Sequence, residues 1–443
     1  MFQSGKQIPY IVSLLTIAIC LSSPSVAAAK KKKKKKGNWT FEQTYKLLGA
    51  VQQGAIAKEL TNPDNQVYQL PVQTASIEFR PELQGTYKRY KLVLRPRASI
   101  VDDFRDITPL DPAPPGYVAS KASDVKSEAY LNEAYFAGTP TSKLQYVMGL
   151  QNFQWGPAEL ASPSNPLFRD LGLSKTTFYE TRGRGLLRAN YSPSGPTTFI
   201  FISEVFDNGV KRDASDPEFR KKGVMKAEFA DQSQTNYVGL VLSGAEDDKP
   251  LYGSYANYEV FTGLTVYYDM QARVGSMLWK PLLSGTGATF QQSLKAESKT
   301  VYAGLTGFRY VTESNLDFRL ETFYEESAWT PDERQLGRGV IATVPTLENT
   351  QIYLNPGSFF PGQKFLYGSL RIPEWGYKDR FTIAIRDLYS ITDQTQKPQV
   401  VFDTYIGDSI LISTGVTAAF GKADGELTQG YQWQAFFTAA WTL

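Results

Sequence analysis

The sequence predicts an all-β fold: a transmembrane antiparallel up-and-down β-barrel of about 18 strands, with about 16 as the alternative count. Three features of the 443 residues indicate this class. Many segments alternate between apolar and hydrophilic side chains, short and long connections follow one another, and the last segment has one wholly apolar face. No segment offers the ~20 consecutive apolar residues that a membrane-spanning helix needs.

The N-terminus has the features of a secretory signal peptide, which we assign to residues 1–29. The positive charge of Lys6 precedes an apolar stretch at residues 11–21, and small residues lead to an expected cleavage near Ala28 or Ala29. The apolar stretch is too short to span a bilayer comfortably.

The sole cysteine, Cys20, lies within this segment. A lipoprotein that uses Cys20 is the alternative, and the bulky Ile19 in front of it disfavours that reading. Cleavage after Ala29 would leave a mature chain without cysteine, so disulfides within it are not expected.

A lysine-rich tether at residues 30–38 precedes the predicted barrel, which covers residues 39–443. The net charge is +3, but without Lys6 and the tract Lys30–Lys36 there are 39 basic residues against 44 acidic ones. The basic balance is therefore local. We interpret the tract as a solvated tether; the alternative is a contact with anionic lipid or cell-wall polymer. Nucleic acid is not an expected partner of an exported chain.

The first barrel strand is the least obvious one. We count about 17 strands from Val72 onward, and single-chain bacterial barrels have an even number, so one strand must come earlier. The candidate is Thr40–Leu60, which on local signals resembles a helix because Thr40 and Gln43 have capping-box spacing. The parity argument favours a strand at about Leu47–Lys58.

Three later segments, residues 76–84, 91–100 and 315–324, show the alternation most clearly. Each has charged or amide side chains on one face and apolar side chains on the other, which is the period of a strand. The strands run to about a dozen residues, beyond the about five or six of soluble strands and enough to cross a membrane.

The connections alternate in length, as in outer-membrane barrels, where turns are short on one side and loops are long on the other. Short connections are expected near Tyr87–Arg89, Thr139–Ser142, Pro193–Pro196, Ser233–Asn236, Glu313–Ser314, Gly376–Asp379 and Gly407–Asp408. Long connections are expected near Arg105–Ser123, Pro157–Thr176, Asn208–Lys222, Leu278–Ser298, Ala328–Gln363 and Gly421–Gly430.

The last strand ends at the chain terminus. Its apolar face consists of Tyr431, Trp433, Ala435, Phe437, Ala439, Trp441 and Leu443. Because every backbone polar group must be paired in lipid, we expect this strand to close the barrel against the first one. It resembles the C-terminal assembly signal of Gram-negative outer-membrane proteins, although Leu443 replaces their usual final phenylalanine or tryptophan. The resemblance implies an outer-membrane location and the barrel-assembly machinery as a partner.

A motif lies between residues 147 and 172. Its residues are Gly149, Gln151, Trp155, Gly156, Asn165 and Pro166. They resemble a signature of porin-like outer-membrane proteins, with Leu150 in place of the usual basic residue. Read from the residues alone, Trp155 belongs to an aromatic girdle at the membrane interface and the rest is an ordinary loop.

The hydrophilic faces carry many charges, and an Arg or Lys facing lipid at midplane costs roughly 2–4 kcal/mol, so we place them in the lumen. The candidate lumenal residues are Glu78, Arg80, Glu82, Arg95, Arg97, Arg182, Arg184, Arg188, Asp317, Arg319, Glu321 and Arg386. Singly they can neutralise one another; together they indicate a wet interior that steers polar or charged solutes.

These features predict a porin-like channel for passive diffusion of small polar or charged solutes, surrounded by outer-membrane lipid. The alternative is an adhesin or structural anchor that acts through long extracellular loops. An enzyme is not expected, because the chain has no histidine for Ser-His-Asp or Cys-His catalysis. We expect no cofactor and no metal, since the acidic pairs Asp247–Asp248 and Glu325–Glu326 lack EF-hand spacing. The oligomeric state is not predicted.

Overall fold

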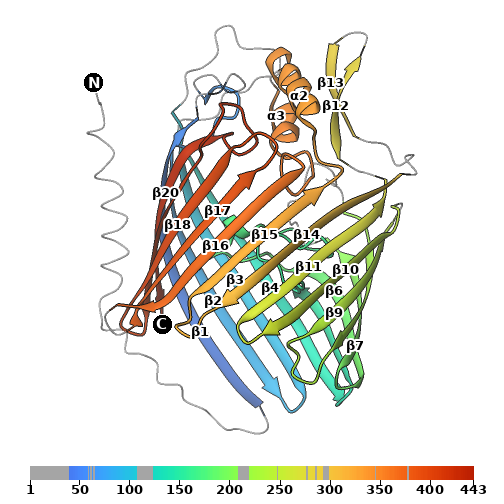
Figure 1. Cartoon of the computed structure of the whole chain (residues 1–443). Coiled ribbons are helices and arrows are strands. Elements are labelled where there is room, and N and C mark those ends of the chain that lie inside the picture. Colours follow the sequence, from blue (N-terminus) through green and yellow to red (C-terminus); the bar gives the residue numbers. More distant parts are fainter. Residues whose placement is uncertain are drawn as a thin grey trace.

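A computed structural model describes residues 39–57, 59, 62, 65–106, 123–207, 219–246, 248–275, 278–284, 287–292, 299–344, 346–376 and 379–443. The assigned signal peptide and the lysine tract lie outside these residues and stay predictions. The described chain forms one closed antiparallel barrel of 18 strands with a small cap at one end (Figure 1). The predicted fold class and strand number are therefore confirmed.

Each barrel strand pairs antiparallel with its two neighbours. The strands are β1 (Trp39–Ile56), β2 (Gln73–Tyr87), β3 (Tyr90–Phe104), β4 (Ser123–Thr141), β5 (Leu144–Gln151), β6 (Arg184–Ser194), β7 (Thr197–Phe206), β8 (Lys222–Ala230), β9 (Tyr237–Ala245), β10 (Leu251–Phe261), β11 (Leu264–Val274), β14 (Thr300–Val311), β15 (Asp317–Glu325), β16 (Lys364–Trp375), β17 (Phe381–Ser390), β18 (Gln396–Ile406), β19 (Ile410–Ala418) and β20 (Tyr431–Thr442). The circle closes where β20 pairs with β1, from Lys46 opposite Thr442 to Ile56 opposite Tyr431.

The first strand is longer than its sequence predicts. β1 begins at Trp39, not near Leu47, and the helical alternative for this segment is wrong. The reason is pairing on both sides: β1 lies against β2 from Trp39 to Gln53 and against β20 from Lys46 to Ile56. Such long-range hydrogen bonding overrides the weak local preference for a helix.

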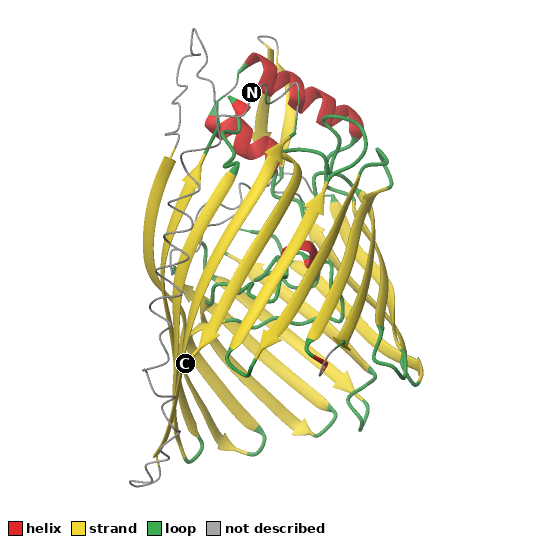
Figure 2. Cartoon of the chain, turned by 90° about the vertical axis from the view of Figure 1, so that its left-hand side faces the viewer, coloured by secondary structure: helices red, strands yellow, loops and turns green. Residues whose placement is uncertain are grey.

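Among the described residues, three of the predicted long loops contain secondary structure, and Pro157–Thr176 carries only the short 3-10 helix η2 (Gly172–Ser174). The segment Leu278–Ser298 carries the hairpin β12 (Trp279–Ser284) and β13 (Gly287–Gln292), whose strands pair only with each other among the described residues. The segment Ala328–Gln363 carries the helices α2 (Pro331–Thr343) and α3 (Leu347–Leu354). These elements gather at the long-loop end of the barrel (Figures 1 and 2).

The cap has its own apolar core. It includes Trp329, Ile341 and Tyr353 around α2 and α3, with Phe290 from the hairpin. The helix α2 begins with a capping box in which the Thr330 side chain accepts from the Glu333 N–H and the Glu333 side chain accepts from the Thr330 N–H. The cap is therefore a built structure and not an open loop.

The outer wall of the barrel is apolar. Exposed side chains on it include Leu92, Ile100, Met148, Leu187, Met225, Leu240, Leu242, Val266, Phe318 and Phe437. They alternate along the strands with inward-facing residues. Together they form the apolar outer surface that a membrane barrel presents to lipid. Among the described residues, no helix has the length and apolarity to cross a membrane.

Leu240, in the middle of β9, tests this orientation because its side chain is 54% exposed. We expect Leu240→Arg to lower the free energy of unfolding from lipid vesicles by about 2–4 kcal/mol, the cost of a cation at the bilayer midplane. Urea titration of the refolded protein measures it, with Leu240→Ile as the apolar control. Equal unfolding midpoints for both variants would contradict a lipid-facing Leu240.

The interior is not uniformly wet. Inward apolar side chains of β6–β10, such as Leu186, Val224 and Val241, are buried against residues of the β5–β6 connection, and β11–β17 show the same pattern. The wet interior expected from the charged faces therefore does not extend to this part of the wall. Green connections cross the inside of the barrel in Figure 2. The β5–β6 connection therefore occupies part of the lumen.

Candidate functional site

The β5–β6 connection, residues 152–183, folds into the barrel, and we call it the lumenal loop. Two glycines of the sequence motif lie near its start. Gly149 has φ +122°, and a Cβ there would collide with the carbonyl oxygen of Ala134. Gly156 has φ +98°, and a Cβ there would collide with the Asp269 carboxylate. Only glycine adopts such φ angles readily. Gly149 still pairs with both neighbouring strands of the wall, and Gly156 lies in the connection that folds inward.

The other motif residues fold the loop. The Gln151 amide donates to the Leu186 carbonyl oxygen at 3.1 Å. The Asn165 side-chain oxygen accepts from the backbone N–H of Leu167 at 3.0 Å and of Phe168 at 3.2 Å. The Pro166 carbonyl oxygen accepts from Lys222 at 3.1 Å, which joins the loop to β8.

Trp155 lies inside the barrel. Its side chain is 8% exposed and packs in a core with Leu167, Phe168 and Val224. The expectation of an aromatic girdle at this position is wrong, because the connection that follows β5 folds into the barrel and carries the indole with it.

Two fully buried carboxylates of the wall hold the loop. Asp269 on β11 accepts from the Ser162 hydroxyl at 2.7 Å and from the Ser164 N–H at 2.6 Å. Glu321 on β15 accepts from the N–H groups of Glu159 and Leu160, each at 2.8 Å. Carboxylates that accept from backbone N–H form strong, charge-assisted hydrogen bonds.

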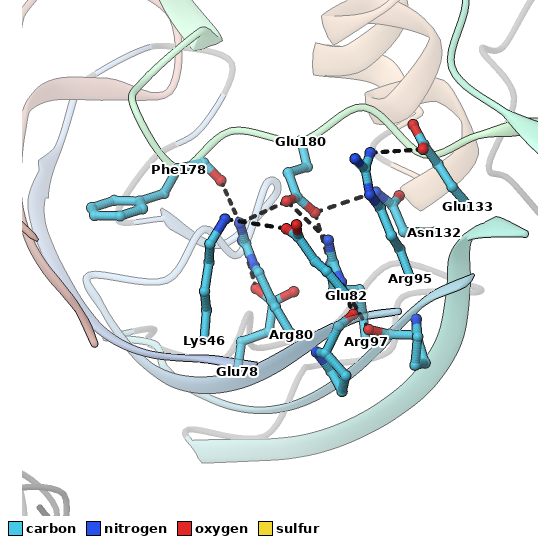
Figure 3. A network of polar contacts seen from close by, with 12 residues as sticks. Lys46, Glu78, Arg80, Glu82, Arg95, Arg97, Asn132, Glu133, Phe178 and Glu180 are labelled. Carbon is cyan, nitrogen blue, oxygen red and sulfur yellow. Dashed lines mark hydrogen bonds and ion pairs between the residues drawn. The ribbon is translucent and has the colours of Figure 1, made fainter. Parts of the chain in front are cut away.

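Glu180 holds the other end of the loop (Figure 3). Its carboxylate accepts hydrogen bonds from two N–H groups of Arg97, at 2.8 and 3.0 Å, and lies 3.4 Å from Arg80. Arg80 also donates to the Phe178 carbonyl oxygen at 2.9 Å and to Glu78 at 2.8 Å. Burial alone would raise the pKa of Glu180, but the bond from Arg97 and the charge of Arg80 keep that pKa below its ordinary value.

The structure pairs most of the predicted lumenal charges. Ion pairs join Lys46 to Glu82, Arg95 to Glu133, Arg182 to Glu128, Arg184 to Glu204, Arg309 to Asp317, and both Arg319 and Arg386 to Glu159. Arg188 lies 4.0 Å from the centre of the Phe153 ring. Arg182 belongs to the lumenal loop and not to a strand face, because β6 begins only at Arg184.

Sequence reasoning missed Asp269, Glu159 and Glu180. Asp269 stands in the alternating segment of β11, on the same face as Tyr267 and Gln271, so the strand period could have found it. Glu159 and Glu180 belong to the loop, where no period applies. Their roles depend on which wall residues the folded loop meets.

Two cavities lie on opposite sides of the lumenal loop. The larger one, of about 990 Å³, lies toward the long connections, between loop residues such as Arg169 and Tyr179 and the ends of β9 and β10. The smaller one, of about 410 Å³, lies toward the short turns, near Asp317 at the start of β15 and Thr382 close to the start of β17. Both are lined largely by charged and polar side chains, which suits hydrated solutes.

A closed 18-stranded barrel with an apolar outer wall and an inward-folded loop is the architecture of an outer-membrane channel. No family model matches the sequence, and no curated protein matches it. Solved structures match the whole fold at low identity.

Three of these structures are Occ-family outer-membrane channels. OccAB1 of Acinetobacter baumannii has a TM-score of 0.52 and 8% identity, with 93% of this chain and 99% of that one covered. OccK5 (OpdH) of Pseudomonas aeruginosa has a TM-score of 0.51 and 8% identity, covering 91% and 98%. OpdK of P. aeruginosa, in a structure with vanillate, has a TM-score of 0.50 and 9% identity, covering 91% and 98%. The chain thus has the fold of the Occ outer-membrane channels.

Proposed function

We propose that this protein is an outer-membrane channel through which small polar or charged solutes diffuse passively past the lumenal loop. The observation that supports it best is the pair of polar cavities, about 990 and 410 Å³, on the two sides of that loop inside a closed barrel. Their size fits small molecules, and their lining replaces part of a solute's hydration shell. The crystal structure of OpdK, which has a similar fold, was determined with vanillate, a small solute.

An adhesin or anchor is the second candidate, and the cap favours it. The helices α2 and α3 and the hairpin β12–β13 form a folded unit beyond the long-loop end, with Leu283 79% exposed. An anchor needs such a surface but no open path. The cavities need an explanation that an anchor does not give.

Planar-bilayer recording of the refolded mature chain separates the two. A channel gives uniform, steady current steps whose conductance rises with salt. An anchor with a filled lumen gives none, although the same sample would still be a folded, heat-modifiable barrel. Absence of steps from such a folded sample would rule out the proposed channel.

The pair of Lys46 and Glu82, 3.1 Å apart and partly exposed on β1 and β2, supplies a charge-selectivity prediction. Two unit charges 4 Å apart in water interact with an energy of about 1 kcal/mol. We therefore expect Glu82→Gln, which removes one negative charge, to raise the anion-to-cation permeability ratio by about two- to fivefold. Lys46→Gln should lower the ratio by a similar factor. The reversal potential in a salt gradient measures both, and a shift of both variants in the same direction would contradict it.

A further inference from the structure

Glu159 of the lumenal loop has an unusual set of partners. Its Oε1 accepts from the Tyr367 hydroxyl at 3.0 Å and lies 3.4 Å from Arg386 Nε. Its Oε2 accepts from the Ser369 hydroxyl at 3.2 Å and lies 3.3 Å from Arg319 Nε. Each carboxylate oxygen thus meets one hydroxyl donor and one guanidinium, and the donors come from β15, β16 and β17. The wall at this place is built as a carboxylate-binding site.

The backbone at Glu159 does not depend on these contacts. Glu321 holds the N–H groups of Glu159 and Leu160, at 2.8 Å each, and Lys175 donates to the Glu159 carbonyl oxygen at 3.0 Å. The side chain can therefore leave its partners by rotating about its own bonds while the loop stays in place. It is also 19% exposed, so the site is open to the lumen and not sealed.

The cavity of about 410 Å³ lies directly against this site. Its lining includes four cationic side chains, those of Lys175, Arg319, Arg371 and Arg386. Apart from Glu159, the lining includes two carboxylates, Asp317 and Asp403. With Glu159 in place, four cations face three carboxylates; when its side chain leaves, four cations face two carboxylates around a space large enough for a small molecule. A negatively charged solute would replace the negative charge that leaves with Glu159.

We propose that Glu159 is an internal counter-ion that occupies an oxyanion site in the lumen, and that the carboxylate of a small anionic solute takes its place. The step exchanges one carboxylate for another on the same donors and breaks no covalent bond. The inference rests on the proposed channel function, because a solute must reach the lumen. It makes the Glu159 side chain an autoinhibitory contact that weakens anion binding at this site.

The test measures chloride current through single channels of the mature chain in the presence of added acetate, the simplest carboxylate. Glu159→Ala removes the internal carboxylate. It should lower the acetate concentration that halves the current by at least about fivefold, because the interaction of two unit charges at contact distance in water changes a binding constant by about that factor. Glu159→Gln, which keeps the side-chain volume, should shift it in the same direction. Adding Arg386→Gln to Glu159→Ala should reverse the gain.

Glu78→Gln is the matched control. Glu78 is another lumenal carboxylate paired with an arginine, but it does not line this cavity, and Arg80 keeps Glu180 as a partner. Its acetate sensitivity should equal that of the wild type. If the wild-type chain gives no steps, the channel function is wrong. If it conducts but both Glu159 variants keep wild-type acetate sensitivity, the internal counter-ion is wrong and the channel stands.

Discussion

Removing the lumenal loop is expected to raise the single-channel conductance several-fold. Gln151 and Arg184 are paired neighbours on β5 and β6, so a short Gly-Ser turn can replace residues 153–181 without straining the wall. Without the loop, the wall that remains is an 18-stranded barrel, and barrels of 16–18 strands leave an aqueous channel. The buried Asp269 and Glu321 would then be hydrated, which removes their need for backbone partners.

The control for this change lies outside the barrel. Replacing the hairpin β12–β13, residues 279–292, with a similar turn removes residues from the cap but none from the lumen. Its conductance should stay at the wild-type value. Equal conductance of the loop-free variant and the wild type would show that the loop does not limit the current.

Deleting the last strand, residues 431–443, is expected to abolish the folded barrel. The strand β20 pairs with β19 on one side and with β1 on the other, so its loss leaves two rows of unpaired backbone groups in lipid. Each unpaired group costs several kcal/mol there, well beyond the roughly 5–15 kcal/mol of typical net stability. Heat-modifiable migration in detergent gels and protease resistance measure the loss.

A smaller deletion is the control for the last strand. Removing Leu443 alone deletes one N–H donor, which bonds to the Tyr45 carbonyl oxygen at 2.8 Å, and leaves the β1–β20 register intact. That variant should still fold. If the chain without β20 also gave a compact, heat-modifiable species, closure by this strand would be wrong.

The wall of the barrel could be predicted from the sequence because its physics is local. On strands such as β2 the outer face is apolar and the inner face is charged, so residues such as Phe79 and Arg80 alternate with period two. Parity then required a strand before Val72, and β1 supplies it against the local helix signal of Thr40 and Gln43.

The contents of the barrel could not be predicted in the same way. The path of the lumenal loop depends on contacts between residues far apart in the sequence, such as Asp269 with Ser162 and Ser164. No pattern within the loop encodes these contacts. The start of α2 does have a local signal. Thr330 and Glu333 have capping-box spacing around Pro331, inside a segment whose alternation pattern predicts only a long connection.

The candidate lumenal residues show the same division. The strand period identified Arg97, Arg319 and Arg386 as inward-facing charges, but their partners Glu180 and Glu159 come from the loop. The sequence therefore indicates where the cations are and not what neutralises them. The residues that neutralise the cations matter more for transport, because a paired arginine attracts a solute much less than a free one.

Single-channel recording of the refolded mature chain in a planar bilayer tests the central claim most directly, namely that a water-filled path passes the lumenal loop inside a closed barrel. We predict uniform steps for the wild type, and larger uniform steps once residues 153–181 are replaced. A folded, protease-resistant wild-type sample whose current stays at the level of the bare membrane, with or without the loop, would contradict it.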